Sequence, residues 1–242
     1  MTAYFNPERL RDQRVGVLSD FSPENKTLLI TFSGIGQGVG VPIFEFFRSL
    51  NGFSINKLFV RDPKRLWYHD GIPGFSRDIE ETAAGLRDLI EESGATRVIT
   101  FGNSMGAYAA ILFGGLLEVD EVHAFAPVTF TDWRNRIRHL DYRFNSYFRK
   151  LDHPTNTRKN YTDLRMVPNI DVPSVHLYYD IDTRLERVHA HRMADVHSNV
   201  YLHPYYGGGH NVIKLIKGKG DLDRIMARAI GLERKPLLSS VV

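Results

Sequence analysis

The chain has 242 residues, of which 43% are hydrophobic and 24% are charged, so we expect one soluble domain built on a single α/β core. It contains no cysteine and no apolar run of the roughly 18 residues that a transmembrane helix needs, which excludes disulfides, thiolate zinc sites and a membrane span. The net charge of +3 is too small to favour a nucleic-acid partner, and the first residues lack the apolar core of a signal peptide, so we expect a cytoplasmic protein.

Strand-like and helix-like segments alternate along almost the whole chain. Short apolar runs predict strands at 27–33, 56–61, 97–102, 120–126, 173–180 and 199–204, with 14–18 as a further edge strand. Helical periodicity is found at 41–50, 75–94, 105–118, 184–197 and 219–231. This alternation predicts an α/β fold with a doubly wound, mostly parallel sheet. In such a sheet the ligand site lies at the carboxyl ends of the strands.

Residues 129–168 interrupt the alternation and predict an inserted cap. The segment 131–165 holds nine Lys or Arg and four Asp, with aromatic residues between them. One interpretation is a solvated face. The other is a lid whose Trp133, Arg136 and Arg138 contact an anionic or sugar-containing ligand.

The segment Gly102-Asn103-Ser104-Met105-Gly106 fits the pattern G-x-S-x-G and lies between a predicted strand and a predicted helix. Such a turn holds a serine in a strained backbone conformation and lifts its hydroxyl above the sheet. The segment therefore predicts that Ser104 is a nucleophile.

A serine nucleophile needs a base, and the base needs a carboxylate, in the chain order Ser, Asp or Glu, His. Two aspartates, Asp180 and Asp182, follow the strand at 173–180, and His210 follows the last strand in a glycine loop. We take His210 as the base. Either aspartate could be the acid, and we favour Asp182 because Asp180 could instead pin the turn.

The other histidines fit other roles. His69, with the neighbouring Trp67, could line the site, whereas His123 and His176 lie inside strands and are expected to be packed or paired. His191 and Asp195 have the spacing of a metal pair, but a surface pair fits them better, and we expect no metal site.

The glycine-rich loop after the strand at 27–33 is expected to supply part of an oxyanion hole. One donor should be the N–H of Met105, and the second should be that of Ile35, with Gly34 as the alternative. Gly34 and Gln37 of this loop are also candidates for substrate contact. The loop matches neither the dinucleotide fingerprint nor the P-loop, so no cofactor is expected.

These motifs resemble the α/β-hydrolase fold family over about residues 27–231. The matching segments are GNSMG as the nucleophile turn, FSGIG as the oxyanion loop, YYDID as the acid turn and GGGHNV as the histidine loop. The resemblance implies a Ser104, Asp182, His210 triad and chemistry through an acyl-serine. Two departures are Ser33 before the oxyanion glycine and Tyr179 in the acid turn, and the family's first strands could be missing from the sheet.

Three functions remain open on the sequence alone. The first is a serine hydrolase that cleaves an ester or thioester. The second is an acyltransferase that moves the acyl group to a carbohydrate or another hydroxyl acceptor. The third is a non-catalytic binding protein on the same fold.

Overall fold

The computed structural model describes residues 9–10, 12, 14–36, 43–151, 161–167 and 174–232. Gln37 and the cap residues 152–160 and 168 lie outside these ranges. Within the described part of the chain, no helix is long and apolar enough to cross a membrane.

A seven-stranded sheet forms the centre of the molecule, in the order β1-β3-β2-β4-β5-β6-β7. Its strands are β1 (Val17–Asp20), β2 (Thr27–Phe32), β3 (Asn56–Val60), β4 (Arg97–Asn103), β5 (Glu121–Phe125), β6 (Ser174–Asp180) and β7 (Val200–Tyr205). Only β1 is antiparallel, and it lies at the edge beside β3. The predicted doubly wound, mostly parallel sheet is therefore confirmed, including the extra edge strand.

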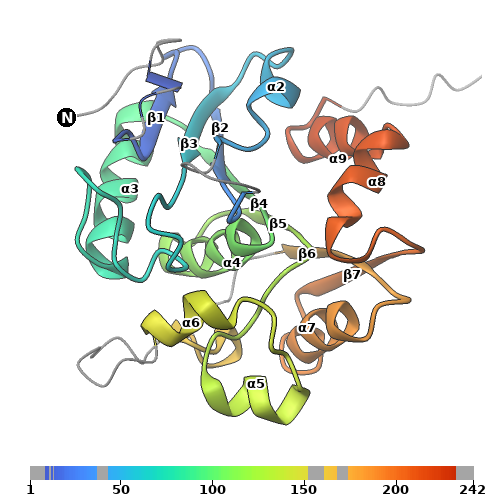
Figure 1. The fold of residues 1–242 in the computed structure, drawn as a ribbon. Coiled ribbons are helices and arrows are strands. Elements are labelled where there is room, and N and C mark those ends of the chain that lie inside the picture. Colours follow the sequence, from blue (N-terminus) through green and yellow to red (C-terminus); the bar gives the residue numbers. More distant parts are fainter. Residues whose placement is uncertain are drawn as a thin grey trace, which may run out of the picture.

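Helices cover both faces of the sheet, as the continuous apolar character of its inner strands requires. One layer holds α3 (Ile79–Ser93), α4 (Met105–Leu117) and α7 (Arg184–Ala194). The other holds α2 (Phe47–Leu50), α8 (Val212–Gly218) and α9 (Asp221–Ala229) (Figure 1). Two buried apolar clusters, one for each layer, fill the space between the helices and the sheet.

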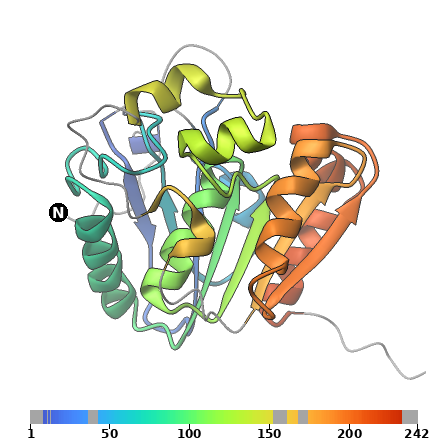
Figure 2. The same cartoon turned by 90° about the horizontal axis from the view of Figure 1, so that it is seen from below.

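The segment between β5 and β6 is the one for which the sequence predicts an inserted cap, and it is called the cap below. Two short helices, α5 (Trp133–His139) and α6 (Asn145–Leu151), and a 3₁₀ turn, η2 (Leu164–Met166), make up its described part. Figure 2 shows α5 and α6 lying across one edge of the sheet. Because the chain enters the cap from the end of β5, this is the carboxyl edge, where the site is expected.

Candidate active site

Ser104 lies at the tight turn between β4 and α4. Its backbone has φ 57° and ψ −116°, a conformation that a residue with a side chain rarely adopts. A Cβ atom at Gly102 would come within 2.0 Å of the Gly106 carbonyl oxygen, and one at Gly106 within 2.1 Å of the Phe32 carbonyl oxygen. Only glycine fits at both positions, so the spacing of this motif follows from the close crossing of α4 over β4 and β2.

His210 meets Ser104 from the loop after β7. The Ser104 Oγ and the His210 Nε2 are 2.7 Å apart. His210 lies in the 3₁₀ turn η3 (Gly209–Asn211). Three glycines with positive φ directly precede it in the sequence, Gly207, Gly208 and Gly209. The loop thus brings the last strand of the sheet back to the turn after β4, and the expected pairing of Ser104 with His210 is present in the structure.

The carboxylate beside His210 is Glu186, and this corrects the choice of Asp182. The Glu186 Oε1 lies 2.9 Å from the His210 Nδ1. Glu186 is in the first turn of α7, and its side chain is buried. Burial opposes its ionisation, but His210 and Arg143 hold the pKa of its carboxyl below the ordinary value. Glu186 therefore contacts the ring nitrogen of His210 that does not face Ser104.

The two predicted aspartates have other places. Asp180 pins the acid turn to the histidine loop, since its carboxylate accepts hydrogen bonds from the Asp182 N–H (2.8 Å), the Thr183 hydroxyl (3.0 Å) and the Gly209 N–H (2.6 Å). Asp182 is exposed, and among the described residues no hydrogen bond joins it to His210. The expectation that Asp180 could pin the turn agrees with these contacts.

A sequence signal for Glu186 existed in the pattern of α7. The residues of this helix that the structure buries include Glu186, His189, Ala190 and Met193, which recur at helical spacing on one face. A glutamate on the buried stripe of an otherwise polar helix needs a partner. The prediction of the acid was wrong because the turn after β6 offers two aspartates, whereas the acid lies one helical turn further on, in α7.

The cap contributes an arginine to this carboxylate. The Arg143 Nη1 lies 2.6 Å from the same Glu186 Oε1, and its other nitrogens hold Asp141 at 2.8 and 2.9 Å. Asp141 also accepts a hydrogen bond from His189 Nε2 at 2.9 Å. Burial lowers the pKa of His189 to about 4, so this histidine is neutral. The Arg143 guanidinium is thus shared by the carboxylates of Glu186 and Asp141, and this network ties the cap to the site.

The oxyanion loop lies against the nucleophile turn. A Cβ atom at Gly34 would come within 2.8 Å of the Asn103 carbonyl oxygen and 3.7 Å of the Ser104 Cβ. The Glu45 Oε1 lies 3.4 Å from where a Gly34 Cβ would stand, so this side chain borders the loop. Ile35 and Gly34 both remain candidates for the second oxyanion donor. The first N–H groups of α4, including that of Met105, have no partner within the helix.

Glu45 holds this loop in two ways. Its backbone N–H donates to the Ser33 hydroxyl at 3.1 Å, and its carboxylate lies 3.5 Å from the Asn103 amide nitrogen. Burial raises the pKa of Glu45 to about 7, although the contacts with Gly34 and Asn103 oppose the shift. The residue therefore carries a proton that it would not hold in the unfolded chain at mildly acidic pH.

We expect Glu45→Gln to change how stability depends on pH. A carboxyl with a raised folded-state pKa stabilises the fold fully below its unfolded pKa of about 4.3, and this stabilisation is lost as pH rises through about 7. Glutamine does not titrate, so the unfolding free energy of the variant should not fall in this way. Between pH of about 4.3 and about 7, the difference in unfolding free energy should therefore shift in favour of the variant by up to roughly 3 kcal/mol. Urea unfolding at several pH values measures it, and parallel curves would contradict the assignment.

The remaining predicted substrate contacts divide into buried and exposed side chains. Trp67 is buried and packs on Phe148, with ring centroids 4.4 Å apart, and His69 is buried and bonded to the Tyr108 hydroxyl at 3.0 Å. Neither lines an accessible surface, which corrects that expectation. Trp133 is 54% exposed on α5.

Arg136 and Arg138 are both in α5 but differ in burial. Arg136 is buried, donates to the Asn145 side-chain oxygen at 3.0 Å and lies 5.0 Å from the Phe148 ring centroid. Arg138 is exposed. The expectation that both contact a ligand is thus corrected for Arg136, which packs inside the cap.

These two arginines form a matched pair for mutation. Arg136→Ala should lower the unfolding free energy by about 1–3 kcal/mol, because it removes a hydrogen bond and buried packing. Arg138→Ala should change it by less than about 0.5 kcal/mol, as exposed substitutions do. Thermal or urea unfolding compares them, and equal losses in both variants would contradict the description of the cap.

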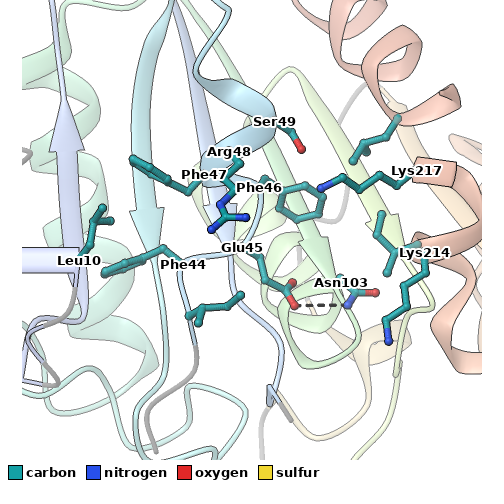
Figure 3. Close-up of a pocket in the computed structure, with 13 residues that line it drawn as sticks. Leu10, Phe44, Glu45, Phe46, Phe47, Arg48, Ser49, Asn103, Lys214 and Lys217 are labelled. Atoms are coloured by element: carbon teal, nitrogen blue, oxygen red, sulfur yellow. Dashed lines mark hydrogen bonds between the residues drawn. The ribbon is translucent and has the colours of Figure 1, made fainter. Parts of the chain in front are cut away.

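A pocket of about 600 Å³ adjoins the nucleophile turn at Asn103. Its lining comes mainly from residues 43–49 and from α8. Figure 3 shows Lys217 pointing from that helix toward Phe46, and Lys214 running past Asn103. The lining also includes the Phe44 and Phe47 side chains and Arg48, so the pocket combines apolar surface with positive charge, close to the site.

By sequence, no family model and no curated protein matches the chain, so its relatives are found by structure. Among solved structures, the chain is similar to an α/β-hydrolase enzyme from a lagoon-sediment metagenome, with a TM-score of 0.56, 13% identity, and coverage of 88% of this chain and 94% of that one. The chain has the α/β-hydrolase fold.

Two further structures share the α/β-hydrolase fold of this chain. The capsule O-acetyltransferase of Neisseria meningitidis serogroup A has a TM-score of 0.63 and 14% identity, over 87% of this chain and 90% of that one. The fluorophosphonate-binding serine hydrolase F of Staphylococcus aureus has a TM-score of 0.59 and 10% identity, over 85% and 84%. At these identities the likeness concerns the fold, so the chemistry of this chain has to be argued from its own residues.

Proposed function

We propose that this protein is a serine hydrolase that cleaves an ester or thioester through an acyl-serine at Ser104. The observation that carries the proposal is the chain of contacts from Ser104 Oγ to His210 Nε2 and from His210 Nδ1 to Glu186 Oε1, at 2.7 and 2.9 Å. Such a chain lets the histidine accept the serine proton while the carboxylate stabilises the imidazolium that forms.

The reaction follows from this geometry. The Ser104 oxygen attacks the carbonyl carbon as its proton moves to His210 Nε2, and the N–H groups of Met105 and Ile35 are proposed to stabilise the oxyanion. His210 then gives the proton to the leaving alcohol or thiol, and the acyl group stays on Ser104. In the second half, water attacks the acyl carbon as His210 takes its proton, and the bond from the acyl group to the Ser104 oxygen then breaks. His210 returns the proton to Ser104 as the carboxylic acid leaves.

Hydrolysis of small neutral esters and thioesters by the purified chain tests the proposal. We expect turnover above the buffer rate with p-nitrophenyl acetate and with an acyl thioester, and a burst of product if deacylation limits the rate. No turnover of either substrate in folded protein would contradict it.

Acyl transfer is a second candidate, favoured by the positively charged pocket. The capsule O-acetyltransferase with the same fold has been solved in complex with CoA. The positive charges of Arg48, Lys214 and Lys217 in the pocket beside Asn103 suit the phosphates of such an acyl donor. The acceptor would then be a hydroxyl group, such as that of a carbohydrate, in place of water.

Acetyl-CoA and a neutral acetyl ester separate the two candidates. If the pocket holds the donor, Lys214→Ala and Lys217→Ala should raise the KM for acetyl-CoA several-fold and leave that for the neutral ester unchanged. Lys26→Ala, an exposed lysine before β2, is the matched control. Equal KM values for acetyl-CoA in all three variants would contradict the proposal that this pocket binds the acyl donor. If no acyl group is transferred to a hydroxyl acceptor, hydrolysis is the function that the chemistry supports.

A further inference from the structure

A second cluster of chemically active side chains lies on β5 and β6, away from the nucleophile turn. Glu121, His123 and His176 each offer one ligand atom, and these atoms all lie within 4.8 Å of one another. His123 pairs with His176 across the two strands, and Glu121 stands two residues before His123 on the same face of β5. The expectation that the two histidines are packed or paired agrees with these contacts.

Of the two distances from the Glu121 Oε1, one equals the spacing between the ligands of one small metal ion and the other is a hydrogen-bond length. The Glu121 Oε1 lies 2.9 Å from the His123 Nε2 and 3.3 Å from the His176 Nε2. With zinc–ligand bonds of about 2.0–2.2 Å in a tetrahedron, neighbouring ligand atoms stand about 3.3–3.5 Å apart. Small shifts of the two stacked rings would therefore place three ligand atoms around one ion.

The outer partners of the cluster suit metal binding as well. The His123 Nδ1 lies 3.0 Å from the Tyr178 hydroxyl, and the His176 Nδ1 lies 2.8 Å from the His203 Nε2. A hydroxyl and an imidazole can each either donate or accept. Both histidines can thus move their proton from Nε2 to Nδ1 without losing the outer hydrogen bond, which frees both Nε2 lone pairs for a metal.

The Glu121 carboxylate is also held in an orientation that suits metal binding. Arg97 donates to the Glu121 Oε2 at 2.8 Å and fixes that oxygen. The other oxygen faces both imidazoles. The side chain of His123 is 4% exposed, whereas those of Glu121 and His176 are 16% and 20% exposed, so an ion can enter from one side.

We propose that Glu121, His123 and His176 form a binding site for a divalent transition-metal ion such as Zn²⁺, with water as the fourth ligand. Two imidazoles and one carboxylate are a donor set that suits zinc and cobalt, and they are a poor set for Mg²⁺. The ion would join β5 to β6 and so stabilise the sheet. This proposal is independent of the acyl-serine chemistry.

Titration of the EDTA-treated full chain with Zn²⁺, Co²⁺ and Mg²⁺ tests the site. We expect one equivalent of Zn²⁺ to bind and raise the melting temperature, Co²⁺ to give the intense visible bands of four-coordinate geometry, and Mg²⁺ to do neither. Glu121→Gln and His176→Gln should abolish stoichiometric binding, and Tyr178→Phe should weaken it about 10-fold or more. His139→Gln, in α5, is the control and should bind like the wild type.

Two results would overturn the proposal. One is the absence of stoichiometric Zn²⁺ binding to the wild type, and the other is equal binding by wild type, Glu121→Gln and His176→Gln. A measurement without substitution covers the case in which the variants fail to fold. Zn²⁺ should protect His176, the more exposed of the two histidines, from diethylpyrocarbonate in the wild type, mapped by mass spectrometry. Equal modification of His176 with and without Zn²⁺ would contradict the site.

Discussion

Glu186→Gln is expected to lower the turnover number by about 10⁴-fold, the order that loss of a triad carboxylate costs in serine enzymes. The Glu186 Oε1 lies 2.9 Å from the His210 Nδ1 and is buried beside Arg143. An amide at this place removes the charge that stabilises the imidazolium and allows the histidine to take the wrong tautomer. Kinetics with a neutral ester measures the loss.

The aspartates of the preceding turn provide the controls. Asp182→Asn should leave turnover within about 2-fold, because exposed substitutions away from a site perturb little. Asp180→Asn should reduce it by an intermediate amount, since its carboxylate holds the histidine loop at Gly209. A larger loss at Asp182 than at Glu186 would show that the carboxylate has been assigned to the wrong residue.

Ser104→Ala should lower turnover by about 10⁶-fold, as removal of a catalytic serine does. Water would then have to attack the substrate without an acyl-enzyme, and His210 would have no nucleophile to activate. Steady-state kinetics on protein freed of contaminating esterases measures the loss, and near wild-type turnover would remove the acyl-serine mechanism.

Ser104→Gly separates this loss from any loss of fold. The φ of 57° at Ser104 is strained for a residue with a side chain and is accessible to glycine. The glycine variant should therefore be inactive and also more stable than the wild type, by up to about 1–3 kcal/mol. An inactive variant that unfolds more easily would leave the strained turn unexplained.

Much of the fold could be predicted because its signals are local. The apolar runs of the strands, the glycines around Ser104 and the glycine loop before His210 each follow from a short stretch of sequence. The helix α8 and the cap helices α5 and α6 could not be assigned in the same way, because they are seven residues long and owe their stability to packing.

The site was harder to predict where it depends on contacts between distant residues. Arg143 and Glu186 are 43 positions apart and meet only when the cap folds over α7. The positive charge of the cap therefore suggested ligand contacts, whereas Arg136 and Arg143 serve contacts within the protein. The meeting of His123 with His176 is limited in the same way, since the pairing of β5 with β6 has to be known first.

The central claim, that Ser104 is an activated nucleophile in this α/β-hydrolase fold, is tested most directly by labelling with a fluorophosphonate and mapping the adduct by mass spectrometry. The account predicts one adduct, on the peptide with Ser104, at a rate that falls strongly in Glu186→Gln and vanishes in Ser104→Ala. An unlabelled Ser104 in folded protein, or equal labelling of the wild type and Ser104→Ala, would contradict it and leave a non-catalytic binding protein as the better description.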